Sequence, residues 1–385
     1  MQKEPSRRYR QRQNVEKPSV LRRVLVLLVL MLLVFAVVTA VRFLLPGSRL
    51  EGRISATLLP CMATQDVTPF GENVLYYDGT SIHCLNAGGG IRWSFPVGVG
   101  ARYSVSDTHV VAWSGSEVFI IDSNGHATYN ENMEGAVQFA RVGSRYCAVV
   151  FGTDTEPTLM VKNMDGTHVD IERDAYPGML LLDVGFYGEA DQYMWTLAMD
   201  VYGVSINTVL NTFQVGKMNT GVVNLGSYLA YHVVYENSNL RVFTTQQMYV
   251  YDYKAVQDLS ASMLVHGWQV VNESIPVRGS ADILLARTSQ LNSAEGITDL
   301  RILNGRTDRR FIVPTRCVGA AVQNGSIYAL SGNVIYRTSS SRQQFYSHQI
   351  PLPAGVEITA LLGLTSNGRA IVACGNEVYS VTLPR

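Results

Sequence analysis

The sequence predicts an all-β fold preceded by one transmembrane helix, and three observations support this prediction. The first is an uncharged apolar run at residues 24–41, behind a basic tail. The second is a long series of short alternating runs rich in Val, Ile, Tyr and Phe, separated by clusters of Gly, Asn, Asp and Ser. The third is a period of about 42 residues in these runs, which is the length of a four-stranded propeller blade. We therefore predict a membrane-anchored β-propeller.

The N-terminal segment predicts the topology of the chain. Residues 1–23 carry eight basic and two acidic residues, a net charge of +6, and the remainder has a net charge of −6. The apolar run at 24–41 covers roughly 27 Å as a helix, close to the thickness of a bilayer core, and residues 42–45 can extend it. Since Lys and Arg in a short flank stay on the cytoplasmic side, we expect a single-pass cell-membrane protein with its N-terminus in the cytoplasm. The expected segments are a tail at 1–23, a signal-anchor helix at 24–45 that contacts the lipid bilayer, and a linker at 46–52.

A cleaved signal peptide is the alternative, because Val38–Ala40 has small residues where a signal peptidase would cut. The length of the apolar run and the position of Arg42 just after that cut favour an uncleaved anchor. The mildly acidic exported part, residues 53–385, offers no basic face for nucleic acid.

The exported part contains eight copies of a unit in which an apolar strand, a tight polar turn and a second strand follow one another. Their spacing predicts about eight blades of four strands. A seven-bladed ring is the alternative, because the units are uneven in length and the copies from Gln192 and Leu240 are the hardest to divide. The copies start at Asn73, His109, Tyr146, Gln192, Leu240, Ile283, Ser326 and Arg369.

The two ends of the exported part are expected to close the ring. The last copy stops after its third strand, and "RISATLLP" at Arg53–Pro60 has strand character without a partner. We predict that strand 53–60 supplies the missing outer strand of the last blade, which removes two exposed edges. This closure brings Cys61 and Cys374 to one blade and makes a disulfide between them conceivable. The competing interpretation is that all five cysteines are small apolar residues inside strands.

The stretch "SIHCLNAGGGIRWSF" at Ser81–Phe95 resembles the repeat of quinoprotein-dehydrogenase-like, or PQQ-repeat-like, propellers. In that repeat a strand ends at Asp or Asn, a Gly-rich turn follows, and a Trp on the outer strand docks on the next blade; Asn86, Gly88–Gly90 and Trp93 match these places. The superfamily includes the non-catalytic scaffold of the bacterial outer-membrane protein assembly machine. The whole chain also resembles a bacterial family of single-span, membrane-anchored propellers.

The resemblance does not extend to the quinone site. A quinone in this superfamily would be expected near vicinal cysteines, a calcium-binding carboxylate cluster and a stacking Trp, and no two cysteines here are adjacent. We therefore predict no cofactor.

No catalytic, cofactor-binding or metal-binding residues are predicted from motifs. The glycine run lacks the Lys-Ser/Thr pair of a P-loop and does not precede a helix, so we interpret it as a hairpin turn. The seven histidines occur singly, without the spacing of a metal site. They are His83, His109, His126, His168, His232, His266 and His348.

We expect a non-enzymatic binding or scaffolding module of the cell envelope, with a protein or envelope partner on a propeller face. The longest inter-strand segments, at Thr153–Thr158, Leu291–Thr298 and Ser339–Gln344, are the predicted recognition elements. One alternative is an enzyme with a site in the central channel, such as a quinoprotein-like oxidoreductase or a hydrolase. A second alternative is an envelope sensor coupled to a partner through the basic tail.

Overall fold

The computed structural model describes residues 28–34 and 54–385, apart from 174–175, 237–238, 277–278, 292 and 294. Met1–Gly52 and Arg53–Arg385 form two separate units. Residues 28–34 are helical. No helix within the described part of the chain has the length and apolarity that crossing a bilayer requires. The predicted tail, the predicted linker and most of the predicted span at 24–45 lie outside the described residues, so the anchor stays a prediction.

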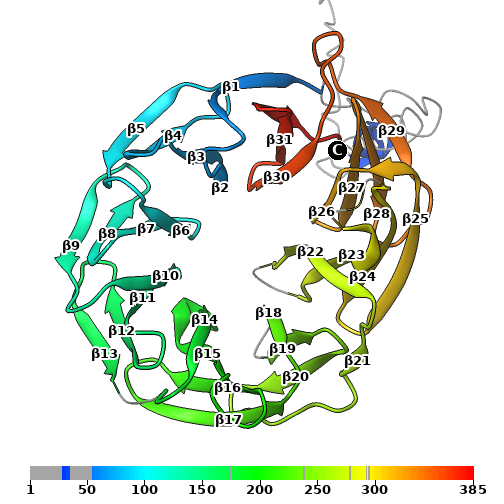
Figure 1. The fold of residues 1–385 in the computed structure, drawn as a ribbon. Coiled ribbons are helices and arrows are strands. Elements are labelled where there is room, and N and C mark those ends of the chain that lie inside the picture. The colour runs from blue at the N-terminus through cyan, green and yellow to red at the C-terminus, as the bar shows by residue number, and fades with distance from the viewer. Residues whose placement is uncertain are drawn as a thin grey trace, which may run out of the picture. The chain divides into compact units, whose positions relative to one another are not determined.

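The second unit consists of eight antiparallel sheets of four strands each, arranged around a central opening (Figure 1). Blade 1 contains β2 (Thr68–Phe70), β3 (Asn73–Tyr77), β4 (Ser81–Leu85) and β5 (Ile91–Pro96). Blade 2 contains β6 (Arg102–Val105), β7 (His109–Ser114), β8 (Glu117–Asp122) and β9 (Ala127–Asn132). Blade 3 contains β10 (Val137–Val142), β11 (Tyr146–Gly152), β12 (Pro157–Asn163) and β13 (His168–Glu172). Blade 4 contains β14 (Leu180–Tyr187), β15 (Tyr193–Asp200), β16 (Asn207–Gln214) and β17 (Met218–Gly226).

The remaining blades follow the same order. Blade 5 contains β18 (Ala230–Glu236), β19 (Asn239–Thr244), β20 (Gln247–Asp252) and β21 (Met263–Leu264). Blade 6 contains β22 (Trp268–Ser274), β23 (Asp282–Arg287), β24 (Ile297–Asn304) and β25 (Thr307–Cys317). Blade 7 contains β26 (Gly319–Gln323), β27 (Ser326–Ser331), β28 (Val334–Ser339) and β29 (Tyr346–Gln349). Blade 8 contains β30 (Ala360–Thr365), β31 (Arg369–Cys374), β32 (Glu377–Thr382) and β1 (Ala56–Met62). Two short 3-10 turns, η1 (Glu189–Asp191) and η2 (Thr288–Gln290), lie between strands of blades 4 and 6.

The eight sheets confirm the eight-bladed prediction, and the seven-bladed alternative is wrong. Five of the eight predicted copies begin on the first residue of a blade's second strand, and those from Gln192, Leu240 and Ile283 begin one residue away from it. Blade 5 was hard to divide because its outer strand, β21, has two residues and follows an irregular connection at 253–262.

Ring closure by the N-terminal strand is also confirmed. β1 pairs antiparallel with β32, with Ala56 opposite Val381 and Leu59 opposite Val378. The described strand begins at Ala56 and continues to Met62, two residues past the predicted end. β1 therefore provides the fourth strand of blade 8, and the buried Leu59 packs among residues of blades 8 and 1.

The hypothesis of a disulfide between Cys61 and Cys374 is wrong. All five cysteines are buried free thiols. Cys61 lies in β1 and Cys374 in β31, and β32 runs between these strands, so their Cα atoms are roughly 9–10 Å apart. That separation exceeds the 7 Å within which two cysteines can be bridged. The two thiols also lie in different apolar clusters, one toward blade 1 and one toward blade 7.

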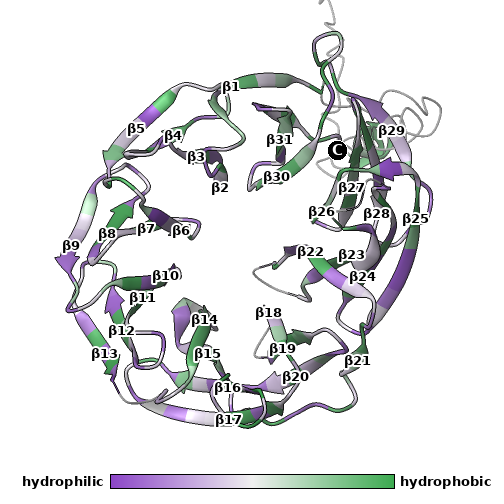
Figure 2. Ribbon diagram, viewed as in Figure 1, coloured by the Kyte–Doolittle hydropathy of each residue, from purple (hydrophilic) through white to green (hydrophobic). Residues whose placement is uncertain are grey.

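The cores lie between neighbouring blades. The second and third strands of each blade are mostly buried, as in β7 and β8, whereas outer strands such as β5 and β9 alternate between exposed and half-buried residues. Figure 2 shows this difference as hydrophilic stretches along β9 and β25 at the rim of the ring. Eight apolar clusters follow one another around the ring, and most join side chains of two adjacent blades.

A recurring turn joins the third and fourth strands in four blades. Its first residue, Asn86 in blade 1, accepts hydrogen bonds on Oδ1 from the N–H groups two and four residues later, at 2.9 and 3.1 Å. Asp122 in blade 2 and Asp252 in blade 5 do the same, at 2.8–2.9 Å. The fourth residue of each turn has a positive φ, as at Gly89 and Gly125, which a glycine adopts without strain. The glycine run is thus a hairpin turn, as predicted.

These turns are also where blades dock. The ring of Trp93 on β5 lies against Gly125 in the turn of blade 2, where an added Cβ would be 2.5 Å from the ring, and its Nε1 donates to the Ser123 carbonyl at 3.0 Å. Thr128 of blade 2 donates in the same way to the Met164 carbonyl of blade 3, at 2.5 Å. The predicted docking of the outer-strand Trp on the neighbouring blade is therefore confirmed.

The ring has two sides, which we call the entry side and the opposite side. β1 begins on the entry side, where loops connect first to second and third to fourth strands. The opposite side carries the loops between second and third strands and the connections from one blade to the next. Hydrogen bonds between neighbouring loops agree with this division, since Ser366 donates to Gly71 on the entry side and Gly178 to Thr155 on the opposite side.

Candidate functional site

The three predicted recognition segments do not form one site. Thr153–Glu156 connects β11 to β12 on the opposite side, and Pro157 and Thr158 already belong to β12. The described part of Leu291–Thr298 lies on the same side, three blades away. Ser339 ends β28, and the rest of Ser339–Gln344 lies between β28 and β29 on the entry side.

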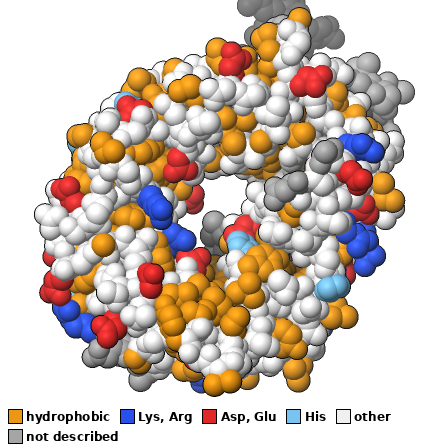
Figure 3. Space-filling view, viewed as in Figure 1, with side chains coloured by type: hydrophobic (Ala, Val, Ile, Leu, Met, Phe, Trp, Pro, Cys, Tyr) orange, Lys and Arg blue, Asp and Glu red, His pale blue; other side chains and the backbone are white. Residues whose placement is uncertain are grey.

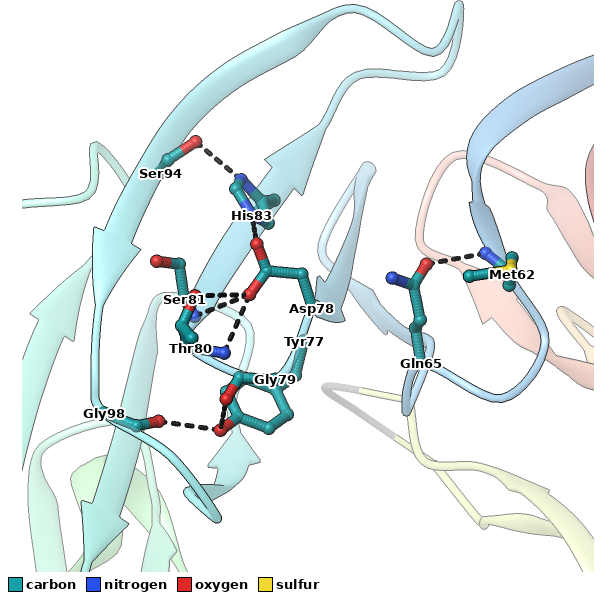
Figure 4. Close-up of polar contacts among 10 residues, drawn as sticks. All are labelled: Met62, Gln65, Tyr77, Asp78, Gly79, Thr80, Ser81, His83, Ser94 and Gly98. Carbon is teal, nitrogen blue, oxygen red and sulfur yellow. Dashed lines mark hydrogen bonds and ion pairs between the residues drawn. The ribbon is translucent and has the colours of Figure 1, made fainter.

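Blade 1 holds a Ser–His–Asp hydrogen-bond relay (Figure 4). Ser94 Oγ lies 2.7 Å from His83 Nδ1, and His83 Nε2 lies 2.8 Å from Asp78 Oδ2. His83 and Ser94 are cross-strand partners in β4 and β5, and Asp78 begins the turn between β3 and β4. The imidazole also stacks on Tyr76, with ring centroids 4.8 Å apart.

The protonation geometry of this relay is that of a general base. A neutral imidazole that donates from Nε2 to Asp78 accepts the Ser94 hydroxyl proton at Nδ1. The hydrogen bond from His83, together with those from the Ser81 and Thr80 N–H groups, holds the pKa of Asp78 well below its usual range. However, those two N–H groups, at 2.8 Å, are already bound to Asp78 Oδ1 and do not face a reacting group at Ser94. Ser94 itself lies on the exposed outer strand, so the relay's clearest role is to fix the β3–β4 turn and the β4–β5 pair.

The sequence prediction missed this relay because each histidine was considered singly. The signal lay in the glycine turn itself. Once Asn86–Gly90 is taken as the hairpin turn, counting outward along both strands, with one residue extra at the bulge, places His83 opposite Ser94.

Ion pairs link the inner strands of neighbouring blades. Arg141 Nε on β10 donates to Asp183 Oδ1 on β14 at 2.8 Å, and His232 Nε2 on β18 lies 2.8 Å from Glu273 Oε2 on β22. Figure 3 shows basic, acidic and histidine side chains on the wall of the central opening. Within the described residues, no three His, Cys, Asp or Glu side chains gather as metal ligands would. These pairs connect blades 3 to 4 and 5 to 6.

A cluster of exposed apolar side chains lies on the opposite side of blade 4. The loops at 201–206 and 227–229 leave the same end of the blade, because Thr208 pairs with Gly226 where β16 and β17 meet. We call their five exposed apolar residues the blade-4 patch. They are Tyr202 (61% exposed), Val204 (110%), Ile206 (52%), Tyr228 (47%) and Leu229 (45%). Figure 3 shows hydrophobic side chains gathered over blades 4 and 5 beside the opening.

The closed ring of eight four-stranded blades defines the protein as an eight-bladed β-propeller. No protein-family model and no curated protein sequence matches the chain. The solved structure of Sqt1 from Saccharomyces cerevisiae is similar, with a TM-score of 0.54 and 9% identity over 86% of this chain and 100% of that one. BamB from Moraxella catarrhalis aligns over 86% of this chain and 96% of its own, with a TM-score of 0.48 and 10% identity. The likeness to Sqt1 supports the fold alone, and the resemblance to quinoprotein-like repeats stays a prediction.

Proposed function

We propose that this protein is a membrane-anchored binding module that holds a protein partner on its propeller outside the cytoplasm. The observation that carries the proposal is the blade-4 patch, since a soluble ring has no folding reason to expose five large apolar side chains on two adjoining loops. The patch lies on the side of the ring opposite to the start of β1. Aromatic and aliphatic anchors in such a patch are the usual centre of a protein interface.

Site-specific crosslinking in membranes tests this proposal. A photoreactive residue at position 228 should capture a defined partner, and Val204→Asp with Ile206→Asp should abolish the capture while the melting temperature stays unchanged. Val256→Asp is the matched control, because Val256 is 62% exposed on the entry side of blade 5. Equal capture by the patch variant and the control would contradict the proposal.

The anchor at 24–45 and the location outside the cytoplasm are supported by the sequence, through the basic tail and the apolar run. N-terminal sequencing of the membrane-extracted protein tests them separately. We expect the intact N-terminus and resistance of the protein to alkaline extraction. A mature N-terminus near Val41, or release of the protein by alkali, would eliminate the anchor without affecting the patch.

The relay in blade 1 favours one second candidate function, an acyl hydrolase in which His83 activates Ser94. A fluorophosphonate probe would then label Ser94, and His83→Ala would prevent the labelling. Absence of labelling in the folded wild-type protein leaves the binding module as the function.

A further inference from the structure

A cavity of about 470 Å³ opens on the entry side of the ring between blades 3 and 4, away from both the relay and the blade-4 patch. Its wall comes from the loop between β10 and β11, the segment around η1, and the turn between β16 and β17. The polar lining residues are Arg145, Tyr146, Gln192, Gln214 and Lys217. A volume of this size is typical of a small-molecule site.

A buried carboxylate shapes this wall. Asp191 is 7% exposed, and its Oδ2 accepts the N–H groups of Arg145 at 2.6 Å and Tyr146 at 3.4 Å. Gly143 packs so closely on the carboxylate that an added Cβ would overlap it. Asp191 thus fixes the backbone from which Arg145 extends.

The η1 segment is held in an unusual backbone conformation. Ala190 and Asp191 have φ values of +51° and +56°, a region that non-glycine residues rarely adopt because their Cβ crowds the backbone there. Their neighbour Gln192 accepts the Val215 N–H on its carbonyl at 3.1 Å, which ties η1 to the β16–β17 turn. Backbone strain of this kind concentrates at ligand sites, and here it lies in the wall of the cavity.

The lining is rich in hydrogen-bond donors and positive charge. The Arg145 guanidinium lies over the Tyr146 ring, 5.2 Å from its centroid. Among the side chains that the structure describes, which exclude that of Glu189, no carboxylate lies at ion-pair distance from Arg145 or Lys217, although eight ion pairs occur elsewhere. The side-chain amides of Gln192 and Gln214 make no hydrogen bond with another described side chain or backbone group. Two cations and two amides therefore line the cavity without an acceptor among the side chains that the structure describes.

We propose that this cavity binds a small molecule carrying a carboxylate or phosphate group, with Arg145 and Lys217 as the cationic contacts and the two glutamines as additional donors. An oxyanion fits because guanidinium and ammonium groups bind it through charge-assisted hydrogen bonds. A cation is disfavoured by both charges. The site is separate from the proposed protein interface and does not depend on it.

Isothermal titration of the full chain in detergent, with citrate and pyrophosphate as separate probes at low ionic strength, tests this proposal. We expect saturable binding of at least one probe. Binding of citrate would identify the group as a carboxylate, and binding of pyrophosphate would identify it as a phosphate. Arg145→Gln or Lys217→Gln should each weaken binding by about tenfold or more. The double variant should abolish binding, and higher salt should weaken it.

Lys254→Gln is the matched control. Lys254 is also exposed on the entry side and also lies over a tyrosine, 5.4 Å from the Tyr253 ring centroid, but it is outside the cavity. The Lys254→Gln variant should bind citrate and pyrophosphate with the same constants as the wild type, and all variants should melt at the wild-type temperature. No binding of either probe at millimolar concentration, undiminished binding by the double variant, or an equal loss in Lys254→Gln would overturn the proposal.

Discussion

Single side chains do more than one task at the boundaries between blades. Trp93 covers the Gly125 turn and donates a hydrogen bond to it, so one residue contributes both apolar contact and orientation. The sequence predicted this contact because the resemblance supplied its place in the repeat. The relay of Asp78, His83 and Ser94 was not predicted. It depends on the register of β4 against β5, which pairs His83 with Ser94, and on the β3–β4 turn, which holds Asp78.

The first prediction concerns the charge on Asp78. Asp78→Asn should lower the free energy of unfolding by about 1 kcal/mol at pH 7, because a charge-assisted bond at a partly exposed site is lost. The pKa of Asp78 is lowered in the folded state. Its contribution is therefore complete above the unfolded pKa near 4 and disappears as the pH falls below that value. Denaturant titrations from pH 7 to pH 2.5 should show the two proteins converging.

Asp258→Asn is the control for this experiment. Asp258 Oδ1 accepts the same three kinds of bond as Asp78 Oδ1, from a backbone N–H and hydroxyl of Ser260 and from the Ala261 N–H, but no histidine contacts it. Its variant should lose less stability. A difference for Asp78→Asn that stays constant down to pH 2.5 would contradict the role assigned to the Asp78 carboxylate.

The second prediction concerns the cysteines. Burial raises the pKa of Cys61 and Cys84 to about 11 and that of Cys147 and Cys317 to about 12, so few thiolates exist at pH 8. We expect no alkylation of the folded protein by iodoacetamide at pH 8 and no change in melting temperature on adding a reductant. Mass spectrometry provides the readout, and full alkylation in denaturant is the control. A melting temperature that falls on adding a reductant would contradict this prediction and show that a disulfide forms.

At the scale of elements, the turns were predictable and the strand irregularities were not. Asn or Asp followed by glycine specifies a hairpin turn locally, and the repeated copies placed the second strands correctly. The inner strands of five blades, however, each contain one extra residue relative to their partner. A bulge of this kind re-aims the side chains that follow it and leaves no residue-type signal. The extra residues are Gln138, Leu182, Tyr231, Val271 and Leu362.

For the same reason the blade 3–4 cavity was invisible in the sequence. Its cations come from two loops about seventy residues apart, and each looks like an ordinary surface charge. The buried Asp191 that positions Arg145 lies in a third loop. The packing of blade 3 on blade 4 brings these segments together.

The third prediction compares two glycines at turns. Gly166 has a φ of +82°, and an added Cβ would overlap the ring of Tyr129 on the preceding blade. Gly115 has a φ of +61° with open space around the Cβ position. Gly115→Ala should cost about 1 kcal/mol from backbone strain, and Gly166→Ala should cost about 2 kcal/mol more, because the docked ring must move. Chemical denaturation of both variants measures the difference, and equal losses would show that the Tyr129 docking contributes little.

At the scale of the whole molecule, the number of blades followed from the period of the copies, and the closure followed from counting strands in the last copy. Both were confirmed. What the period could not provide was the distribution of exposed apolar and charged groups over the two sides of the ring. The blade-4 patch arises from loops whose lengths vary between blades, and such loops are not constrained by the repeat.

The fourth prediction tests the closure with adjacent residues of β1. Leu59 is 2% exposed and Leu58 is 52% exposed. Leu59→Asp should lower the stability of the full chain by about 3 kcal/mol or more, because it places a charge between blades 8 and 1. Leu58→Asp should change it by less than about 1 kcal/mol. Melting curves in detergent provide the comparison, and similar losses for both variants would mean that β1 is not seated in the ring.

The position of β1 also has a consequence for biosynthesis. A chain is made from its N-terminus, so β1 is the first strand of the ring to be synthesised and its partner β32, which ends at Thr382, is the last. Until Glu377–Thr382 has emerged, β1 has no hydrogen-bonding partner, and the unfinished ring presents two open edges. Ring closure therefore acts as a completeness check on translation, because a chain that terminates early cannot hide its edges and is left as a substrate for proteases and chaperones.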